Sequence, residues 1–128
     1  MKLVVQEDGF GCGVACVANI LEVTYREALS LFSNGRRKAT TEGFLCKDLV
    51  NVLGDYEYRY IKPKLRNKIY QNKSIVFIAR CKKYPGGHFL YRMNGIWADP
   101  WINFPDENKK VGFRKRLPGK PIYLISKI

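Results

Sequence analysis

The stretch QEDGFGCGVACVANIL, residues 6–21, places a cysteine where a glycine-rich loop gives way to an apolar run. Alternating glycines favour a turn, and apolar residues then recur at helical spacing from Val14 onward. We therefore predict a helix over residues 12–22 that begins at Cys12. A helix N-terminus favours negative charge, and the thiolate is the nucleophilic form of cysteine. Cys12 is thus a candidate nucleophile, and its alternative role is that of a small buried hydrophobe.

A thiol nucleophile needs a base, and the chain offers a single candidate because His88 is its only histidine. Asn94-Gly95 between two strand-like segments predicts a two-residue hairpin within residues 88–99. In that register His88 and Asp99 share one face as diagonal neighbours, within side-chain reach. The Asp99 carboxylate, which we expect to be partly exposed at the strand end, would orient the imidazole and stabilise its charged form.

Gln6 and two tryptophans complete the candidate site. Negative charge builds on the carbonyl oxygen during acyl transfer, so the Gln6 amide and the Cys12 backbone N–H would supply two donors to it. A surface glutamine is the alternative role for Gln6. Trp97 and Trp101 fall on the His88 face, where they either line a substrate groove or cover the sheet.

The other three cysteines, Cys16, Cys46 and Cys81, are predicted to be core thiols because they fall within apolar helix and strand patterns. A metal site built from Cys12, Cys16 and His88 is a weaker alternative, since it would leave the glutamine and the aspartate without a purpose. We expect neither a metal nor a cofactor.

The remaining patterns place helices first and strands afterwards. A capping box at Thr24 opens a helix to about Phe32, residues 33–43 read as a loop, and Thr41 would cap a third helix that ends at Gly54. The buried stripe of that third helix comprises Phe44, Leu45, Leu49, Val52 and Leu53. Strands are predicted over residues 56–61, 74–81, 88–93, 96–99 and 121–126. This order indicates an α+β fold with an antiparallel sheet, and 128 residues suit one domain, residues 1–128.

Positive charge is concentrated away from the candidate nucleophile. The net charge is +12. Residues 57–83 contain 9 basic residues and 1 acidic residue, and residues 101–128 contain 7 basic and 2 acidic residues. Residues 1–56 contain 6 basic and 7 acidic residues. The two basic segments would attract an acidic partner such as nucleic acid, anionic lipid or an acidic protein, or they form a solvated face that keeps the protein soluble. The chain shows no signal peptide and no apolar run long enough to span a membrane, so we expect a cytoplasmic protein.

The order of four motifs resembles the C39 branch of the papain-like cysteine peptidases. The motifs are Gln6, CGVAC at residues 12–16, GGHFLY at residues 86–91 and ADP at residues 98–100. The resemblance covers roughly residues 4–126. It implies an N-terminal helix that carries the nucleophile, packed on an antiparallel sheet that carries the histidine and the aspartate.

By the same resemblance, Gln6 is the oxyanion residue, Cys12 the nucleophile, His88 the base and Asp99 its partner. The chain departs from many C39 domains of peptide exporters, which have aspartate where it has Gly11 and a longer histidine-to-aspartate segment. No transporter follows here, so the resemblance is to a stand-alone domain and does not imply cleavage of double-glycine leader peptides.

These observations predict a cysteine peptidase that hydrolyses a peptide or isopeptide bond through an acyl-thioester. Two alternatives remain open at this point. The same residues would serve an acyl or amide transferase, because an amine can replace water. A degenerate peptidase fold could instead act as a binding module for an acidic partner, although such a module has no need to keep all four site residues.

Overall fold

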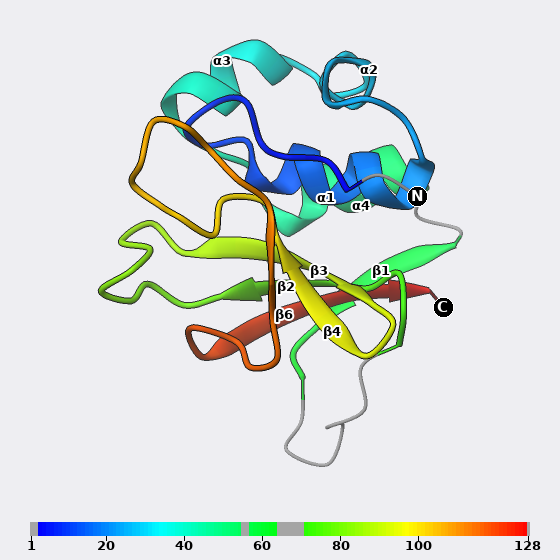
Figure 1. The fold of residues 1–128 in the computed structure, drawn as a ribbon. Coiled ribbons are helices and arrows are strands. Elements are labelled where there is room, and N and C mark those ends of the chain that lie inside the picture. The colour runs from blue at the N-terminus through cyan, green and yellow to red at the C-terminus, as the bar shows by residue number, and fades with distance from the viewer. Residues whose placement is uncertain (1–2, 55–56, 64–70, 128) are drawn as a thin grey trace.

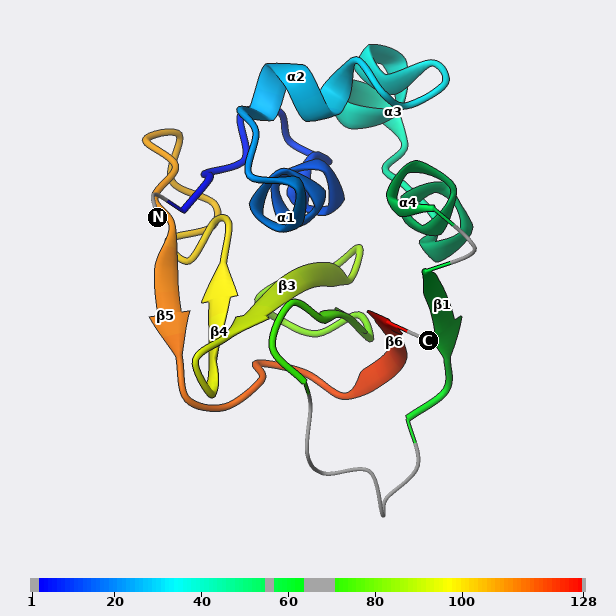
Figure 2. The same cartoon turned by 90° about the vertical axis from the view of Figure 1, so that its right-hand side faces the viewer.

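Helices lie in two layers over one face of a six-stranded antiparallel sheet, in a computed structural model that describes residues 3–54, 57–63 and 71–127 (Figures 1 and 2). The helices are α1 (Cys12–Leu21), α2 (Tyr25–Leu29), α3 (Gly35–Thr41) and α4 (Cys46–Leu53). The strands are β1 (Tyr58–Ile61), β2 (Ile75–Ile78), β3 (His88–Met93), β4 (Ile96–Asp99), β5 (Gly112–Arg114) and β6 (Pro121–Lys127). This is the predicted α+β architecture, with α1 and α4 against the sheet and α2 and α3 above them.

Helix α1 begins at Cys12, and the residue before it must be very small. A Cβ on Gly11 would lie 1.9 Å from the hydroxyl oxygen of Tyr25, which fills the space beside the loop. The helix is buried along most of its length and packs against α2, α4 and β3. An apolar helix that is enclosed on several sides is a core helix, so the position of Cys12 is set by the packing of the whole domain.

The predicted loop over residues 33–43 is wrong, because it contains α3. Asn34 takes a left-handed conformation (φ 54°), and Gly35 lies so close to the Leu29 carbonyl that a Cβ there would be 2.6 Å from its oxygen. The Ser-Asn-Gly signal therefore marks a tight turn rather than a long loop, and it ends the second helix at Leu29, short of Phe32. Burial of Ala39 then holds α3 against the core.

The third predicted helix is α4, but its start differs from the prediction. Thr41 is the last residue of α3, and α4 begins after Leu45, whose N–H donates to the Asp48 carboxylate at 2.8 Å. Leu45 was expected in the buried stripe and is instead 70% exposed, because it lies just outside the helix. Gly54 ends α4 with a positive φ of 102°, as predicted.

The strands follow the order β1-β6-β2-β3-β4-β5, so β2 is central as predicted. The hairpin register is also as predicted, with Met93 opposite Ile96 and Tyr91 opposite Ala98. Strand β2 is shorter than the predicted 74–81, and Tyr56 of the predicted first strand lies outside the described residues. Strand β5 was not predicted; it is three residues long and pairs with β4.

The two faces of the sheet are buried differently. Alternate residues of β2, β3 and β4 face the helices and join the main core, among them Ile75, Phe89, Tyr91 and Ala98. Their neighbours on the outer face form a second, smaller cluster of Val76, Ile78, Tyr84, Leu90 and Trp97. The loops that follow β2 and β4 cover this cluster through Cys81 and Phe104, and Leu117 from the chain between β5 and β6 also packs against it.

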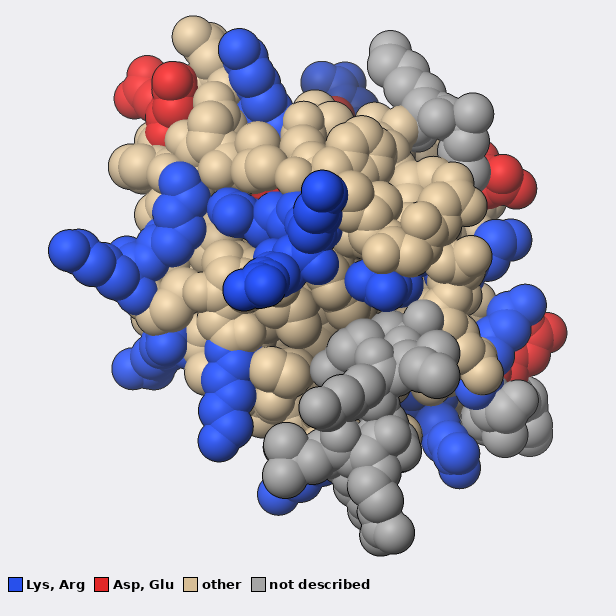
Figure 3. All heavy atoms as spheres, turned by 60° about the horizontal axis from the view of Figure 1, so that its bottom comes forward, with Lys and Arg blue, Asp and Glu red and all other residues tan. Residues whose placement is uncertain are grey.

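Positive side chains gather over this outer side of the sheet (Figure 3). The segments 71–98 and 109–127 hold 12 Lys and Arg residues and contain no Asp or Glu. Arg92 and Arg114 lie directly opposite Trp97 on its two neighbouring strands, and Arg80, Lys115 and Arg116 are exposed on the adjoining loops. No helix in the described part of the chain is long and apolar enough to cross a membrane.

Candidate active site

Cys12 is the first residue of α1 and is partly exposed, whereas Cys16, one turn further on, is fully buried. Burial raises the pKa of the Cys16 thiol well above its ordinary value, and the charges of Cys12 and Asp99 raise it further. Cys16 therefore stays protonated in the core, as its position in the apolar pattern predicted. The four cysteines are free thiols in the structure.

His88 opens β3 and lies beneath the start of α1. Its Nε2 is 2.7 Å from Asp99 Oδ1, which leaves the other ring nitrogen for Cys12. Burial lowers the pKa of His88, but the charge of Cys12, hydrogen bonds with Asp99 and Cys12, and the Asp99 charge outweigh it and raise the pKa to about 9. The imidazolium that this shift favours is held between the Cys12 sulfur and the Asp99 carboxylate.

Asp99 ends β4 and has no exposed surface, which corrects the expectation of a partly exposed carboxylate. The chain after Asp99 turns back over it, so that the Trp101 backbone N–H donates to Oδ1 at 3.0 Å. Two side chains reach the other oxygen: Tyr84 Oη lies 2.6 Å from Oδ2 and Arg114 Nε donates to it at 2.8 Å. Burial opposes ionisation of Asp99, but these bonds and the bond to His88 hold its pKa well below the usual range.

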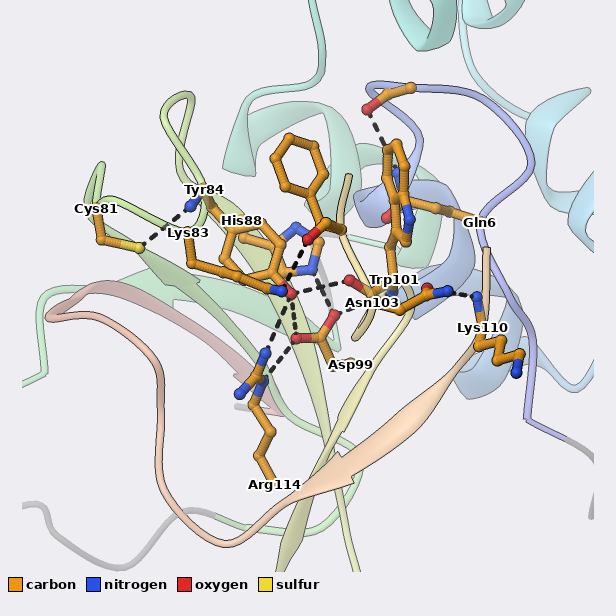
Figure 4. Close-up of polar contacts among 12 residues, drawn as sticks. Gln6, Cys81, Lys83, Tyr84, His88, Asp99, Trp101, Asn103, Lys110 and Arg114 are labelled. Carbon is orange, nitrogen blue, oxygen red and sulfur yellow. Dashed lines mark hydrogen bonds and ion pairs between the residues drawn. The ribbon is translucent and has the colours of Figure 1, made fainter. Parts of the chain in front are cut away.

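Tyr84 and Arg114 are site residues that sequence reasoning missed (Figure 4). Tyr84 stacks flat on the His88 ring, with ring centroids 3.8 Å apart and planes 4° apart. Arg114 comes from β5, a strand too short to show a pattern, and Tyr84 comes from an irregular loop. Neither residue had a sequence signal, because their positions depend on pairing of β5 with β4 and on the closure of the loop before β3.

Gln6 is buried beside the loop that precedes Cys12. Its Nε2 donates to the backbone oxygens of Asp8 at 3.0 Å and Gly9 at 3.4 Å, and its own N–H donates to the Pro100 carbonyl at 3.2 Å. The buried Oε1 has no hydrogen-bond partner. Gln6 thus ties the nucleophile loop to the residue that follows Asp99, and it is not the surface glutamine of the alternative reading.

The two tryptophans are more enclosed than a groove lining requires. Trp97 is 3% exposed, packs in the outer-face cluster and carries the Arg92 guanidinium over its ring at 4.8 Å. Trp101 is 8% exposed and packs edge-on against Phe104, while its indole N–H donates to the Asp106 carbonyl. This burial favours the reading in which both residues cover the sheet.

A partly exposed thiol at the start of a buried helix thus faces a histidine that a buried, ionised aspartate holds in place. The family model that matches this chain is that of the peptidase C39 family, over residues 1–109. The chain belongs to the peptidase C39 family. No curated protein is similar enough to this C39 domain to count as a match.

A solved structure supports the same fold for this C39 domain. The peptidase domain of Streptococcus ComA, a bi-functional ABC transporter involved in a quorum sensing pathway, is 21% identical to it with a TM-score of 0.62. The match covers 98% of this chain and 96% of that one. At this identity the likeness establishes the fold and not the substrate.

Two further features of the C39 domain concern the placement of side chains that could bind a metal ion and an apolar hollow. In the described ranges, no three His, Cys, Asp or Glu side chains are grouped so as to hold a metal ion. An apolar hollow lies between the start of α4 and the sheet, lined by Phe44, Leu45, Cys46, Lys47, Tyr60, Phe77, Phe89 and Tyr123. A Cβ on Gly13 would lie 3.3 Å from the ring of Phe89, so one lining residue of the hollow also packs against the first turn of α1, whereas none of Cys12, His88 and Asp99 lines the hollow.

Proposed function

We propose that this protein is a cysteine peptidase that hydrolyses a peptide or isopeptide bond through Cys12, His88 and Asp99. The observation that carries the proposal is the placement of His88, with one ring nitrogen on the buried Asp99 and the other available to Cys12. Family membership and a solved neighbour that is itself a peptidase domain support it.

In the first half of the reaction, the Cys12 proton rests on His88 and the thiolate attacks the carbonyl carbon of the substrate amide. Negative charge moves to the carbonyl oxygen, where the Cys12 backbone N–H would donate to it, and the Gln6 side-chain amide would join it by giving up its long 3.4 Å bond to the Gly9 carbonyl. The carbon–nitrogen bond then breaks, and the His88 proton passes to the leaving amine. An acyl-thioester on Cys12 and a neutral imidazole remain.

In the second half, neutral His88 takes a proton from water as the water oxygen attacks the thioester carbonyl. The carbon–sulfur bond breaks, the acid leaves, and the proton is again shared between His88 and Cys12. An amine in place of water would give acyl transfer with the same proton movements. Asp99 stays ionised throughout and stabilises the imidazolium that forms in each half.

The apolar hollow supports a substrate that carries an apolar side chain. Its lining is largely aromatic and aliphatic, and one lining residue, Phe89, follows His88 along β3. Burial of one such side chain contributes about 1.5–3 kcal/mol, enough to select among peptides. The exposed Leu45 and Tyr60 at its margin would contact the substrate chain on either side.

The test is incubation of a complex peptide mixture with the protein, followed by mass spectrometry of newly formed termini. Wild type and Cys81→Ala, which removes the other partly exposed thiol, should produce the same new termini, and Cys12→Ala should produce none. New termini that persist in Cys12→Ala, or their absence with wild type, would overturn the proposal. Adding glycinamide distinguishes hydrolysis from transfer, because a transferase would attach it to the new carboxyl end.

A further inference from the structure

The far side of the Asp99 carboxylate holds a second set of contacts that the proposed mechanism does not use. Oδ1 accepts from His88 and from the Trp101 N–H, whereas Oδ2 lies 2.6 Å from the Tyr84 hydroxyl and 2.8 Å from Arg114 Nε. Arg114 Nη2 also reaches the Tyr84 hydroxyl at 3.4 Å, which closes a ring of three side chains. Figure 4 shows these bonds converging on Asp99 from β5 and from the loop before β3.

A carboxylate without exposed surface needs such partners. Burial of an unpaired charge costs several kcal/mol, and a protonated Asp99 would lose its attraction for the imidazolium. The Trp101 N–H and His88 occupy one oxygen only, so they leave the other to be satisfied. Arg114 supplies a full positive charge in a directed hydrogen bond, and its guanidinium is charged at every physiological pH.

Tyr84 contributes a hydrogen bond to Asp99 and an aromatic ring that stacks on His88. Burial raises the pKa of Tyr84, and its bond to Asp99 raises it further, so the hydroxyl stays protonated and remains a donor. The aromatic ring lies parallel to the His88 ring at 3.8 Å and covers one side of it. A covered imidazole cannot tilt toward that side, and water cannot enter between Nε2 and the carboxylate from there.

We propose that Tyr84 and Arg114 are positioning residues that fix Asp99, and through it His88, in the orientation that Cys12 requires. Arg114 and the Tyr84 hydroxyl hold the carboxylate, and the Tyr84 ring holds the plane of the imidazole. This inference rests on the proposed function for its catalytic meaning, but the positions of the two rings and the carboxylate can be measured without a substrate.

The charged groups around His88 determine how removal of Arg114 changes the pKa of His88. They come from Cys12 on α1 and Asp99 on β4, with Arg114 of β5 on the far side of Asp99 and with the Cys16 thiol and the Tyr84 hydroxyl as neutral groups. Arg114 is a like charge for the imidazolium and therefore partly offsets the carboxylate. A neutral replacement leaves Asp99 uncompensated and raises the pKa of His88, whereas a lysine keeps most of that offset.

The primary experiment is an NMR titration of His88, whose signals are unambiguous because the chain has a single histidine. Arg114→Gln should raise the pKa of His88 by roughly one pH unit, the order expected for the loss of one nearby charge. Arg114→Lys should stay close to wild type. The control is Arg116→Gln, which removes an equal charge from an exposed neighbouring position and should leave the His88 titration unchanged.

An unchanged titration in a folded Arg114→Gln protein, or an equal shift in Arg116→Gln, would overturn the proposal. If Arg114→Gln does not fold, Tyr84→Phe decides, because it removes one donor from Asp99 and keeps the stacked ring. That variant should also raise the pKa of His88, and no shift in it would be contrary to the proposal. Tyr84→Ala should additionally speed exchange of the imidazole N–H with water, whereas Tyr84→Phe should not.

Turnover provides an independent readout once a substrate peptide is known. Tyr84→Ala and Arg114→Gln should lower kcat by roughly ten- to a hundredfold with little change in KM, since misplacing a reacting group by about 1 Å costs on that order. Arg114→Lys should recover part of the loss. A protein that cleaves no peptide but shows the predicted His88 shifts would refute the proposed function and leave the positioning role standing.

Discussion

At the scale of single residues, Asp99 is the group on which the site and part of the fold depend. Four donors converge on a carboxylate that water does not reach. Asp99→Ala should therefore lower the free energy of unfolding by about 3–5 kcal/mol, the usual cost of breaking a buried ion pair from one side. Glu107→Ala, at an exposed position, should change it by less than about 0.5 kcal/mol. Equal free energies of unfolding for the two variants, measured in urea, would show that Asp99 does not stabilise the fold.

The contribution of Asp99 to the free energy of unfolding should change with pH in a defined direction. The folded pKa of Asp99 lies below its ordinary value of 3.8, so its contribution to stability is present above that pH and is lost as the pH falls toward the folded value. The difference in unfolding free energy between wild type and Asp99→Asn should therefore be largest on the acid side of neutrality and should shrink below about pH 4. It should also shrink as the pH rises toward the folded pKa of His88, about 9, because Asp99 helps to raise that pKa. Urea titrations at several pH values measure it. A difference that grows as the pH falls below about 4 would contradict the ionised, bonded state of Asp99.

The sequence was more informative about the identity of the site residues than about the contacts around them. Cys12, His88 and Asp99 could be selected from one thiol at a helix start, one histidine and one hairpin register. The burial of Asp99 and its bonds to Tyr84 and Arg114 could not, since they arise where the chain after Asp99 folds back over the sheet. Such contacts are long-range in sequence and leave no periodic pattern.

At the scale of elements, the hairpin and the first helix follow from local signals, and the short elements do not. The Asn-Gly turn fixes the register of β3 and β4, because a one-residue slip would expose Phe89 and Tyr91. Helix α3 and strand β5 are seven and three residues long. Elements of that size are held by tertiary packing, which overrides the loop signal of Ser-Asn-Gly.

The entry to α1 provides a prediction at this scale. Gly11→Ala should destabilise the protein by about 1–3 kcal/mol, the usual cost of overpacking, because its Cβ would lie 1.9 Å from Tyr25 Oη. Gly9→Ala, where a Cβ meets nothing within 4 Å, is the matched control and should change stability by less than about 0.5 kcal/mol.

A double-mutant cycle with Tyr25→Phe tests the cause of that loss. Removing the hydroxyl should relieve a large part of the Gly11→Ala penalty, although the ring carbon that bore it remains 3.0 Å from the new Cβ. Additive effects of the two substitutions would mean that the hydroxyl is not what excludes a side chain at this position.

At the scale of the whole molecule, most basic residues lie away from the candidate catalytic residues, and Arg114 is an exception. The outer side of the sheet is basic (Figure 3), whereas most acidic residues belong to the helical half. If this basic face recruits an acidic substrate region, raising salt should slow turnover of an acidic peptide and leave a neutral one nearly unaffected, with screening over ~8 Å at physiological salt. Charge reversal at Lys115, Arg116 and Lys120 should act in the same way; Arg114 is left intact because it holds Asp99.

Parallel salt profiles for the acidic and the neutral peptide would assign the basic face to solubility alone. That result would leave the proposed chemistry untouched, because the basic residues concerned lie on exposed loops rather than against Cys12. The fold class and the location of the positive segments were predictable from composition along the chain. Their gathering on one side of the sheet was not, since it depends on the order in which the strands pair.

The most direct test of the account is formation of an acyl-thioester on Cys12. The protein would be treated near neutral pH with a thiol-directed acylating agent such as p-nitrophenyl acetate, and the modified residue identified by mass spectrometry. Wild type should acquire one acyl group on Cys12 well before Cys16, Cys46 or Cys81 react, and His88→Gln should lose that preference. Equal modification of the partly exposed Cys12 and Cys81, or an unchanged rate at Cys12 in the His88→Gln variant, would contradict the account.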